Sequence, residues 1–292
     1  MKNINQFITE YIIKKKLDEP IDSEDHYTYF PNTKEELISN IDELLDKEIS
    51  DFNCINTSKI RNMSNLFFYK NFNRKQKSIL KDIDISKWDV SNVESMESMF
   101  EDFNSFNCDI SNWNVSKVEN MDEMFRDCKN FKGKGLENWD VSNVENMGCM
   151  FAHCEKLNCD LSNWNVSKVK YTNTMFSECK NFEGKGLENW DVSNVEDTDY
   201  MFYKCENLNC DLSGWDVNNV TNMTSMFDGC TNFNCDLSNW NVSNVKNMSY
   251  LFNGCKKLNC DLSNWNVKNV TNMLCLFDSC TSLKNKPSWY KE

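Results

Sequence analysis

A tryptophan recurs at intervals of 25 or 26 residues through most of this chain. Self-similarity at a period of about 20–50 residues is typical of proteins built from stacked repeats. One unit buries too little apolar surface to offset the entropy lost by its own backbone, so it needs a neighbour on each face. We therefore expect a stack in which equivalent residues of successive units form columns. The tryptophans are Trp88, Trp113, Trp139, Trp164, Trp190, Trp215, Trp240 and Trp265.

The apolar pattern changes its spacing inside each unit. Counted from the tryptophan, valine recurs at positions +2 and +5, methionine at +8, methionine or leucine at +11, phenylalanine at +12, cysteine at +15, and phenylalanine or leucine at +18. The Trp-x-Val alternation predicts a short strand with both side chains facing inward. The later steps of three or four predict a short helix. Together they predict an α/β repeat solenoid with short parallel strands on one face and short helices on the other.

About nine such units fill residues 51–285, and residues 286–292 end the stack. Residues 1–50 lack the repeat and are predicted to form an N-terminal helical cap, with a first helix over residues 5–17. A second helix is expected to begin at Thr33, where Thr33 and Glu36 fit a capping box. The basic insertion at residues 73–78 predicts a protruding loop. The apolar face of the second helix comprises Leu37, Ile38, Ile41, Leu44 and Leu45.

The motif Val-Ser-x-Val-x-x-Met-x-x-Met-Phe-x-x-Cys-x-x-Phe/Leu resembles the BspA-like leucine-rich repeat. It is most similar to the tryptophan-containing version found in surface proteins of mycoplasma and other low-GC bacteria. The similarity extends over residues 52–285 and recurs in unit after unit. The resemblance implies a right-handed solenoid similar to leucine-rich repeats, whose surface serves adhesion or protein interaction.

The charge of the chain limits its partners. It has 32 Lys and Arg against 45 Asp and Glu, a formal charge of −13, which argues against nucleic acids and anionic membrane surfaces. No apolar run approaches the ~18 residues needed to cross a bilayer, so we expect no membrane insertion. The N-terminus does not resemble a secretory signal, which favours a cytoplasmic location. We expect the protein to be a monomer. The alternative is a cell-surface or secreted protein exported without a signal peptide.

The sequence offers little for catalysis. Only two histidines, His26 and His153, could act in acid–base chemistry or bind a metal near neutral pH. No nucleophile–base pair and no metal-binding cluster stand out against the repeat. We therefore expect neither an enzyme nor a cofactor.

Fifteen cysteines fall mainly at two positions of the repeat, in Phe-x-x-Cys and in Asn-Cys-Asp. In a reducing compartment we expect columns of buried, unpaired thiols. Pairs such as Cys230 and Cys235 have a C-x4-C spacing, but no unit holds the C-x2-C pairs typical of zinc sites. Oxidation of neighbouring column members to disulfides is the other alternative.

An aspartate column raises the question of a cation site. Asp211, Asp236 and Asp261 stand on consecutive units, where stacked carboxylates would repel one another. We expect each side chain to accept hydrogen bonds from its own turn. The alternative is a row of weak Ca²⁺ sites. The tryptophans similarly admit two interpretations, a buried core column or a platform for sugars, of which we expect the core.

The candidate partner-binding residues are tyrosines on the predicted helical side. Outward positions beside the tryptophans are monotonous, whereas positions +9, +10, +13 and +14 vary from unit to unit. We predict that Tyr200, Tyr203 and Tyr250 anchor a partner there. The expected function is a non-catalytic module of the BspA-like adhesion or host-interaction type, binding a protein or a repetitive glycan. The alternative is a cytosolic scaffold that binds proteins without export.

Overall fold

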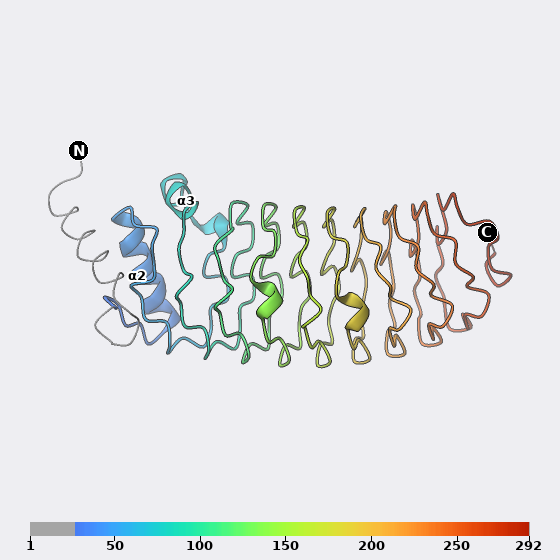
Figure 1. Ribbon diagram of the computed structural model, residues 1–292, viewed down its shortest axis with the longest axis horizontal. Helices are drawn as coiled ribbons and strands as arrows, with labels where there is room; N and C mark the ends of the chain where they lie inside the picture. The colour runs from blue at the N-terminus through green and yellow to red at the C-terminus, as the bar shows by residue number, and fades with distance from the viewer. Residues whose placement is uncertain (1–26, 292) are drawn as a thin grey trace.

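The computed structural model describes residues 27–291. The chain winds through successive coils that stack side by side from one end of the molecule to the other (Figure 1). We define a coil as the segment that runs from one tryptophan to the next. One helix covers the N-terminal end of the stack, and the C-terminus lies at the opposite end. The helix predicted over residues 5–17 lies outside the described residues.

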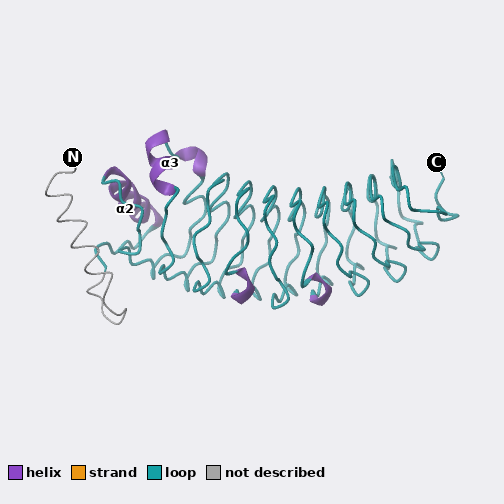
Figure 2. Cartoon of the chain, turned by 45° about the horizontal axis from the view of Figure 1, so that its top comes forward, coloured by secondary structure: helices purple, strands orange, loops and turns teal. Residues whose placement is uncertain are grey.

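The predicted α/β solenoid is wrong in its secondary structure. The described residues contain no strand, and successive coils are joined by isolated parallel bridges, one per coil, such as Asn120 to Asn146. The coils are almost entirely turns and loops (Figure 2). The helical elements are α2 (Lys34–Asp46), α3 (Arg74–Leu80) and three short 3₁₀ helices, η2 (Tyr69–Asn71), η3 (Leu136–Asn138) and η4 (Leu187–Asn189).

Consecutive β-turns explain why the apolar spacing of three did not produce helices. The N–H of Met124 donates to the carbonyl of Met121 at 3.2 Å, and the N–H of Cys128 donates to that of Phe125 at 2.9 Å. A β-turn brings residues i and i+3 together, so both can face the core. Positions +10 and +14 of these coils lie in the left-handed region, with φ values of 55° at Glu123 and 61° at Asp127. A residue in that region interrupts both a helix and a strand.

Most backbone hydrogen bonds between coils run from one coil to the following coil. The N–H groups at positions +8, +10, +12 and +14 donate to carbonyls at positions +7, +9, +11 and +13 of the following coil. Phe125 donates to Met150 at 2.9 Å, and Asp127 donates to Ala152 at 2.8 Å. The four bonds hold each coil in register with the next.

The predicted columns are confirmed. The rings of Phe100 and Phe125 stack with centroids 5.5 Å apart, and those of Trp113 and Trp139 with centroids 6.4 Å apart. The eight tryptophans at positions 88–265 are each no more than 4% exposed, so they form core and not a sugar platform. Each indole also donates to a carbonyl of the preceding coil, as Trp164 Nε1 does to Leu136 O at 2.8 Å. A hydrogen bond thus accompanies each buried ring.

Helix α2 lies at the N-terminal end of the stack (Figure 1). Thr33 is its N-cap, and its hydroxyl oxygen accepts from the N–H of Glu36 at 3.2 Å. The Glu36 carboxylate accepts from the N–H of Asn32, one residue before the expected capping-box partner. The predicted apolar face is buried except for Ile38, which is exposed. The buried members are Leu37, Ile41, Leu44 and Leu45.

The loop predicted for residues 73–78 is wrong, because this segment forms most of helix α3. The Asn73 side chain accepts from the N–H groups of Lys75 and Gln76, and Gln76 reaches back to the N–H of Asn73. This reciprocal capping box stabilises a helix of only seven residues. Leu80 anchors the end of the helix in the core.

A tryptophan of the column should contribute most to the free energy of unfolding where its coil has a neighbour on both sides. Trp215→Phe removes an indole N–H that donates to Leu187 O at 2.8 Å and leaves that buried carbonyl with only the backbone N–H of Trp190, at 3.1 Å. We expect a loss of about 2–4 kcal/mol in the free energy of unfolding, measured with urea. The matched change Trp289→Phe should cost under about 1 kcal/mol, because this indole is partly exposed and water can replace it. Equal losses would contradict this role of burial.

Candidate functional site: a surface strip on the variable positions

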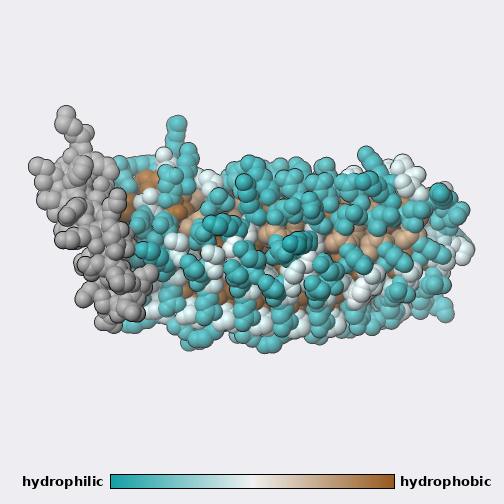
Figure 3. Space-filling view, viewed as in Figure 1, coloured by the Kyte–Doolittle hydropathy of each residue, from teal (hydrophilic) through white to brown (hydrophobic). Residues whose placement is uncertain are grey.

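Polar side chains cover most of the visible face of the stack, with apolar residues between them (Figure 3). The variable positions +10 and +14 carry left-handed residues at each turn of the stack. Across five consecutive coils, position +14 holds two glycines after three large polar residues. These residues are His153, Glu178, Lys204, Gly229 and Gly254.

Side chains from three coils touch one another along this row. His153 Nδ1 lies 3.5 Å from one carboxylate oxygen of Glu178, and Lys204 Nζ lies 3.3 Å from the other. The Lys204 ammonium also lies 4.7 Å from the ring centroid of Tyr203. Tyr203 in turn packs edge-on against Tyr200, with ring centroids 5.6 Å apart. We call these five residues the tyrosine strip.

The charges in the tyrosine strip reinforce one another. Partial burial works against ionisation of Glu178, but Lys204 and His153 outweigh it and lower the pKa of its carboxyl. Contact with the Tyr203 side chain and with Glu178 raises the pKa of Lys204. The Glu178 carboxylate therefore lies between His153 and Lys204, and Lys204 in turn contacts the Tyr203 ring. Tyr200, at the end of the strip, is 39% exposed.

Two glycines leave the surface next to the tyrosine strip without side chains. Gly229 and Gly254 have φ values of 77° and 70°, so glycine suits the left-handed conformation here. A Cβ added at Gly229 would lie 3.0 Å from Cγ of Lys204. The absence of side chains at these two positions leaves room for a partner beside Lys204 and Tyr203.

The structure brings together two of the three predicted anchors. Tyr200 and Tyr203 are in contact within one coil, whereas Tyr250 lies two coils further along. Tyr250 interacts with Cys275 of the next coil, which raises the pKa of the tyrosine. Tyr250 therefore belongs to the same face but not to the tyrosine strip. Sequence reasoning did not single out Glu178 or Lys204, whose adjacency became visible once the coils were in register.

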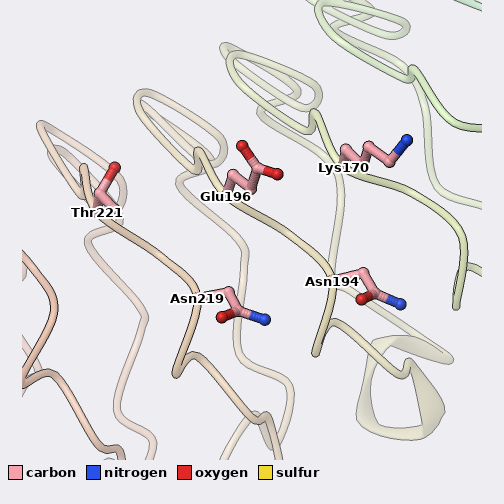
Figure 4. Close-up of a pocket in the computed structure, with 5 residues that line it drawn as sticks. All are labelled: Lys170, Asn194, Glu196, Asn219 and Thr221. Carbon is pink, nitrogen blue, oxygen red and sulfur yellow. The ribbon is translucent and has the colours of Figure 1, made fainter.

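A polar groove of about 360 Å³ lies elsewhere on the stack, between consecutive coils (Figure 4). Asn194 and Asn219 line one side of it, and Lys170, Glu196 and Thr221 line the other. Each asparagine donates to a carbonyl of the preceding coil, as Asn219 does to Ser193 at 2.6 Å. Sequence reasoning missed this bonding, although asparagine recurs at position +4 in most units.

The aspartate column forms local turns, as predicted. Oδ1 of Asp211, of Asp236 and of Asp261 each accepts from the N–H two residues later at 2.9 Å. Hydrogen bonds from the side chain and the N–H of the turn serine lower the pKa of all three carboxyls. Between residues 27 and 291, no three His, Cys, Asp or Glu side chains are grouped as a metal site would require.

Two Gly-Lys-Gly segments, at residues 133–135 and 184–186, place lysines beside aspartates at the same repeat position in other coils. Lys185 Nζ lies 2.6 Å from an Asp160 carboxylate oxygen, and Lys134 pairs with Asp109 in the same way. The ammonium and the turn serine together lower the pKa of Asp160 to about 2. These lysines offset the charge of Asp109 and Asp160.

The Phe-x-x-Cys thiols form a buried column, as predicted, and each one donates a hydrogen bond. Cys205 Sγ donates to Phe176 O of the preceding coil at 2.9 Å, and Cys179 Sγ donates to Phe151 O at 3.0 Å. Burial raises the pKa of Cys205 and of Cys179 far above the usual range. All 15 cysteines are unpaired thiols.

Burial should protect the thiols from reaction with Ellman's reagent at pH 8. Burial raises the pKa of Cys108 to about 11 and of Cys159 to about 12, so few thiolates exist at that pH. We expect at most about two thiols to react within minutes. Cys275 should react first, because burial is not the main cause that raises its pKa, as it is for the other half-buried cysteines. Unfolding in guanidinium should release all 15. Rapid reaction of most thiols in the native protein would contradict the buried column.

A carboxyl beside the tyrosine strip should make stability depend on pH. Burial, reinforced by Asp197, raises the pKa of Asp199 to about 6. Between about pH 4 and 6 the folded state then binds more protons than the unfolded state, so this contribution to stability falls as pH rises. Asp199→Asn should stabilise the protein at pH 7, on the order of 1 kcal/mol for a half-exposed group, and lose that advantage at pH 4. Urea unfolding at both pH values measures this, with Glu206→Gln as the exposed control.

These features place the chain in the class of repeat proteins, here one whose stacked turns bury columns of equivalent side chains. The chain belongs to the DUF285 family, described as Mycoplasma proteins of unknown function, whose model matches residues 35–135, 70–186, 115–212 and 173–290. No curated protein and no solved structure matches the sequence. In the part of the chain that the structure describes, no helix has the length and apolar character needed to span a membrane.

Proposed function

We propose that this protein is a non-catalytic binding module that holds a protein partner on the tyrosine strip. The observation that carries the proposal is the contact between Tyr200 and Tyr203, with the Lys204 ammonium over the second ring. Tyrosine supplies a large, rigid contact area and a polar tip, which makes it a frequent anchor in protein interfaces. The ion pair with Glu178 holds the lysine in place before a partner arrives.

The contrast between variable and repeated positions supports this choice of surface. The repeated outward positions carry mostly Asn, Asp and Ser, many of which bond to the backbone within the stack. Ser98 and Ser225 at position +10 are buried, but larger residues at these positions, such as Tyr200 and Lys204, lie on the surface and are not part of the core. Variation there changes the surface without changing the fold, as recognition of a particular protein requires.

We further propose a relationship to the BspA-like repeat proteins and a role in adhesion or host interaction. The support is the repeat motif, which recurs in each coil with the same spacing. The alternative is a scaffold that assembles proteins in the cytosol. Fractionation of cells into membrane-surface, secreted and cytosolic pools distinguishes the two, because an adhesin must be accessible from outside.

A glycan is the second candidate ligand, favoured by the groove that Asn194 and Asn219 line. Amide, carboxylate and hydroxyl groups on consecutive coils offer a regular series of donors and acceptors. A repeating sugar could match that series, as asparagine side chains can both donate to and accept from hydroxyls. In this case the tyrosine strip would not be needed.

Paired substitutions separate the two surfaces. Tyr200→Ala with Tyr203→Ala should weaken binding to the partner at least about tenfold, the loss expected of interface anchors. Tyr171→Ala is the matched control, because this tyrosine is 45% exposed but lies outside the tyrosine strip. Binding is measured by biolayer interferometry on a panel of host extracellular proteins and by a glycan array.

Each outcome assigns one surface. Loss of a protein ligand in the Tyr200/Tyr203 double variant, with Tyr171→Ala unchanged, supports the proposal. Binding that survives the double variant but is lost in Asn219→Asp would reject the tyrosine strip in favour of the groove. Adding Tyr250→Ala tests whether the third predicted anchor contributes.

A further inference from the structure

The last coil ends in a row of backbone donors. Its N–H groups at positions +8, +10, +12 and +14 have no hydrogen-bond acceptor among residues 27–291. One coil earlier, the equivalent groups donate across the stack at 2.7–3.1 Å. The unpaired donors belong to Met273, Cys275, Phe277 and Ser279. We call this row the amide edge.

The amide edge presents donors without matching acceptors. The carbonyls of Asn272 and Leu274 point back into the stack and accept from the preceding coil at 2.8 and 2.7 Å. Aligned N–H groups of this kind carry partial positive charge and attract anions or carbonyl oxygens. The opposite end of the stack has the reverse polarity. There the Ser64 carbonyl accepts from the Lys34 ammonium of α2, which covers that end.

Apolar surface and charge add to the amide edge. Val267, Val270 and Leu283 are only half-buried, whereas their equivalents in earlier coils are buried. Leu274 is 57% exposed. Residues 265–291 hold four lysines against one aspartate, a net charge of +3 in a chain of net charge −13. The rings of Trp289 and Tyr290 contact Phe277. The four N–H groups and the lysines suit a partner that is acidic and offers main-chain carbonyls.

We propose that the amide edge binds residues 18–25 of a second copy of this chain. Five of these eight residues are acidic and none is basic. The segment needs to offer only acceptors, so the missing N–H of Pro20 costs nothing. Its carbonyls pair with the four N–H groups by following the same turns that the next coil follows inside the stack, and its carboxylates face the lysines of the last coil.

The segment reaches the amide edge of another molecule and not that of its own. Thr28 is bonded to Cys54 at the start of the stack. The six residues from Asp22 to Thr28 span at most about 20 Å, whereas the bridges from Asn62 to Asn272 count eight steps of about 4.8 Å each. The interface is thus head-to-tail between copies, which produces open chains unless the rotation closes a ring.

Sedimentation velocity of the 292-residue protein in 50 mM NaCl tests the interface. We expect species larger than a monomer that grow with concentration and dissociate in 500 mM NaCl, because salt screens the charges. Lys268→Glu with Lys284→Glu should lower the association constant at least about tenfold. The matched control, Lys117→Glu with Lys156→Glu, makes the same charge change on central coils and should leave association unchanged.

Hydrogen exchange locates the contact. In the dissociated protein, the N–H groups of Met273 and Phe277 should exchange at least about tenfold faster than those of Met248 and Phe252. They should become protected as the protein associates or when a synthetic peptide of residues 18–25 is added. Asn and Gln in place of the five acidic residues should abolish both effects.

Three results would overturn the proposal. The first is a monomer at all concentrations together with no protection by the peptide. The second is association that persists in the Lys268/Lys284 variant. The third is association that leaves the amide edge unprotected, which would mean that the copies meet elsewhere. None of these results bears on the tyrosine strip, which lies on inner coils.

Discussion

The structure depends on the register between neighbouring coils. Four backbone N–H groups per coil donate in one direction, and the indole of each tryptophan and the thiol at position +15 donate in the other. A shift of one residue would break the backbone bonds and move the aromatic rings out of their columns. Because each coil supplies acceptors to its neighbours, the polar groups of one coil are satisfied only in the stack. Equivalent residues therefore meet in space, and this proximity creates the tyrosine strip.

The turns that establish this register also create the variable surface. Positions +10 and +14 are left-handed, which costs a residue other than glycine roughly 1–2 kcal/mol. His153, Lys204 and Tyr200 nevertheless occupy such positions, where Gly229 and Gly254 show that glycine fits. Local stability alone would favour glycine or asparagine there. Large side chains at these positions are better explained by what they contact outside the core.

The columns were predictable from the sequence because the period and the apolar positions are both explicit. From them followed the burial of the tryptophans and thiols. The turn role of Asp211 and the capping of α2 by Thr33 followed from the residue types at those positions. The secondary structure was not predictable by the same means, since spacing of three residues fits a helix as well as consecutive β-turns. Only the left-handed conformations distinguish the two, and residues such as Glu123 and Tyr200 do not indicate them by type. To predict the contact of Glu178 with Lys204, one would have to know both the register of the coils and the direction of each side chain.

The two ends of the stack must differ chemically, because the backbone hydrogen bonds at positions +8, +10, +12 and +14 all point in the same direction along the stack. Some N–H groups donate back to the preceding coil, as Glu119 does to Glu94 at position +6 and Asn209 does to Glu183, but these bonds offset only part of the alignment. The carbonyl end is therefore negative and the amide end positive, as the two termini of a helix carry opposite partial charges. Helix α2 brings the Lys34 ammonium to the carbonyl end, so a cation lies where the negative partial charge favours it. By the same electrostatics, the amide end suits carboxylates, and a stack of any number of such coils retains that asymmetry.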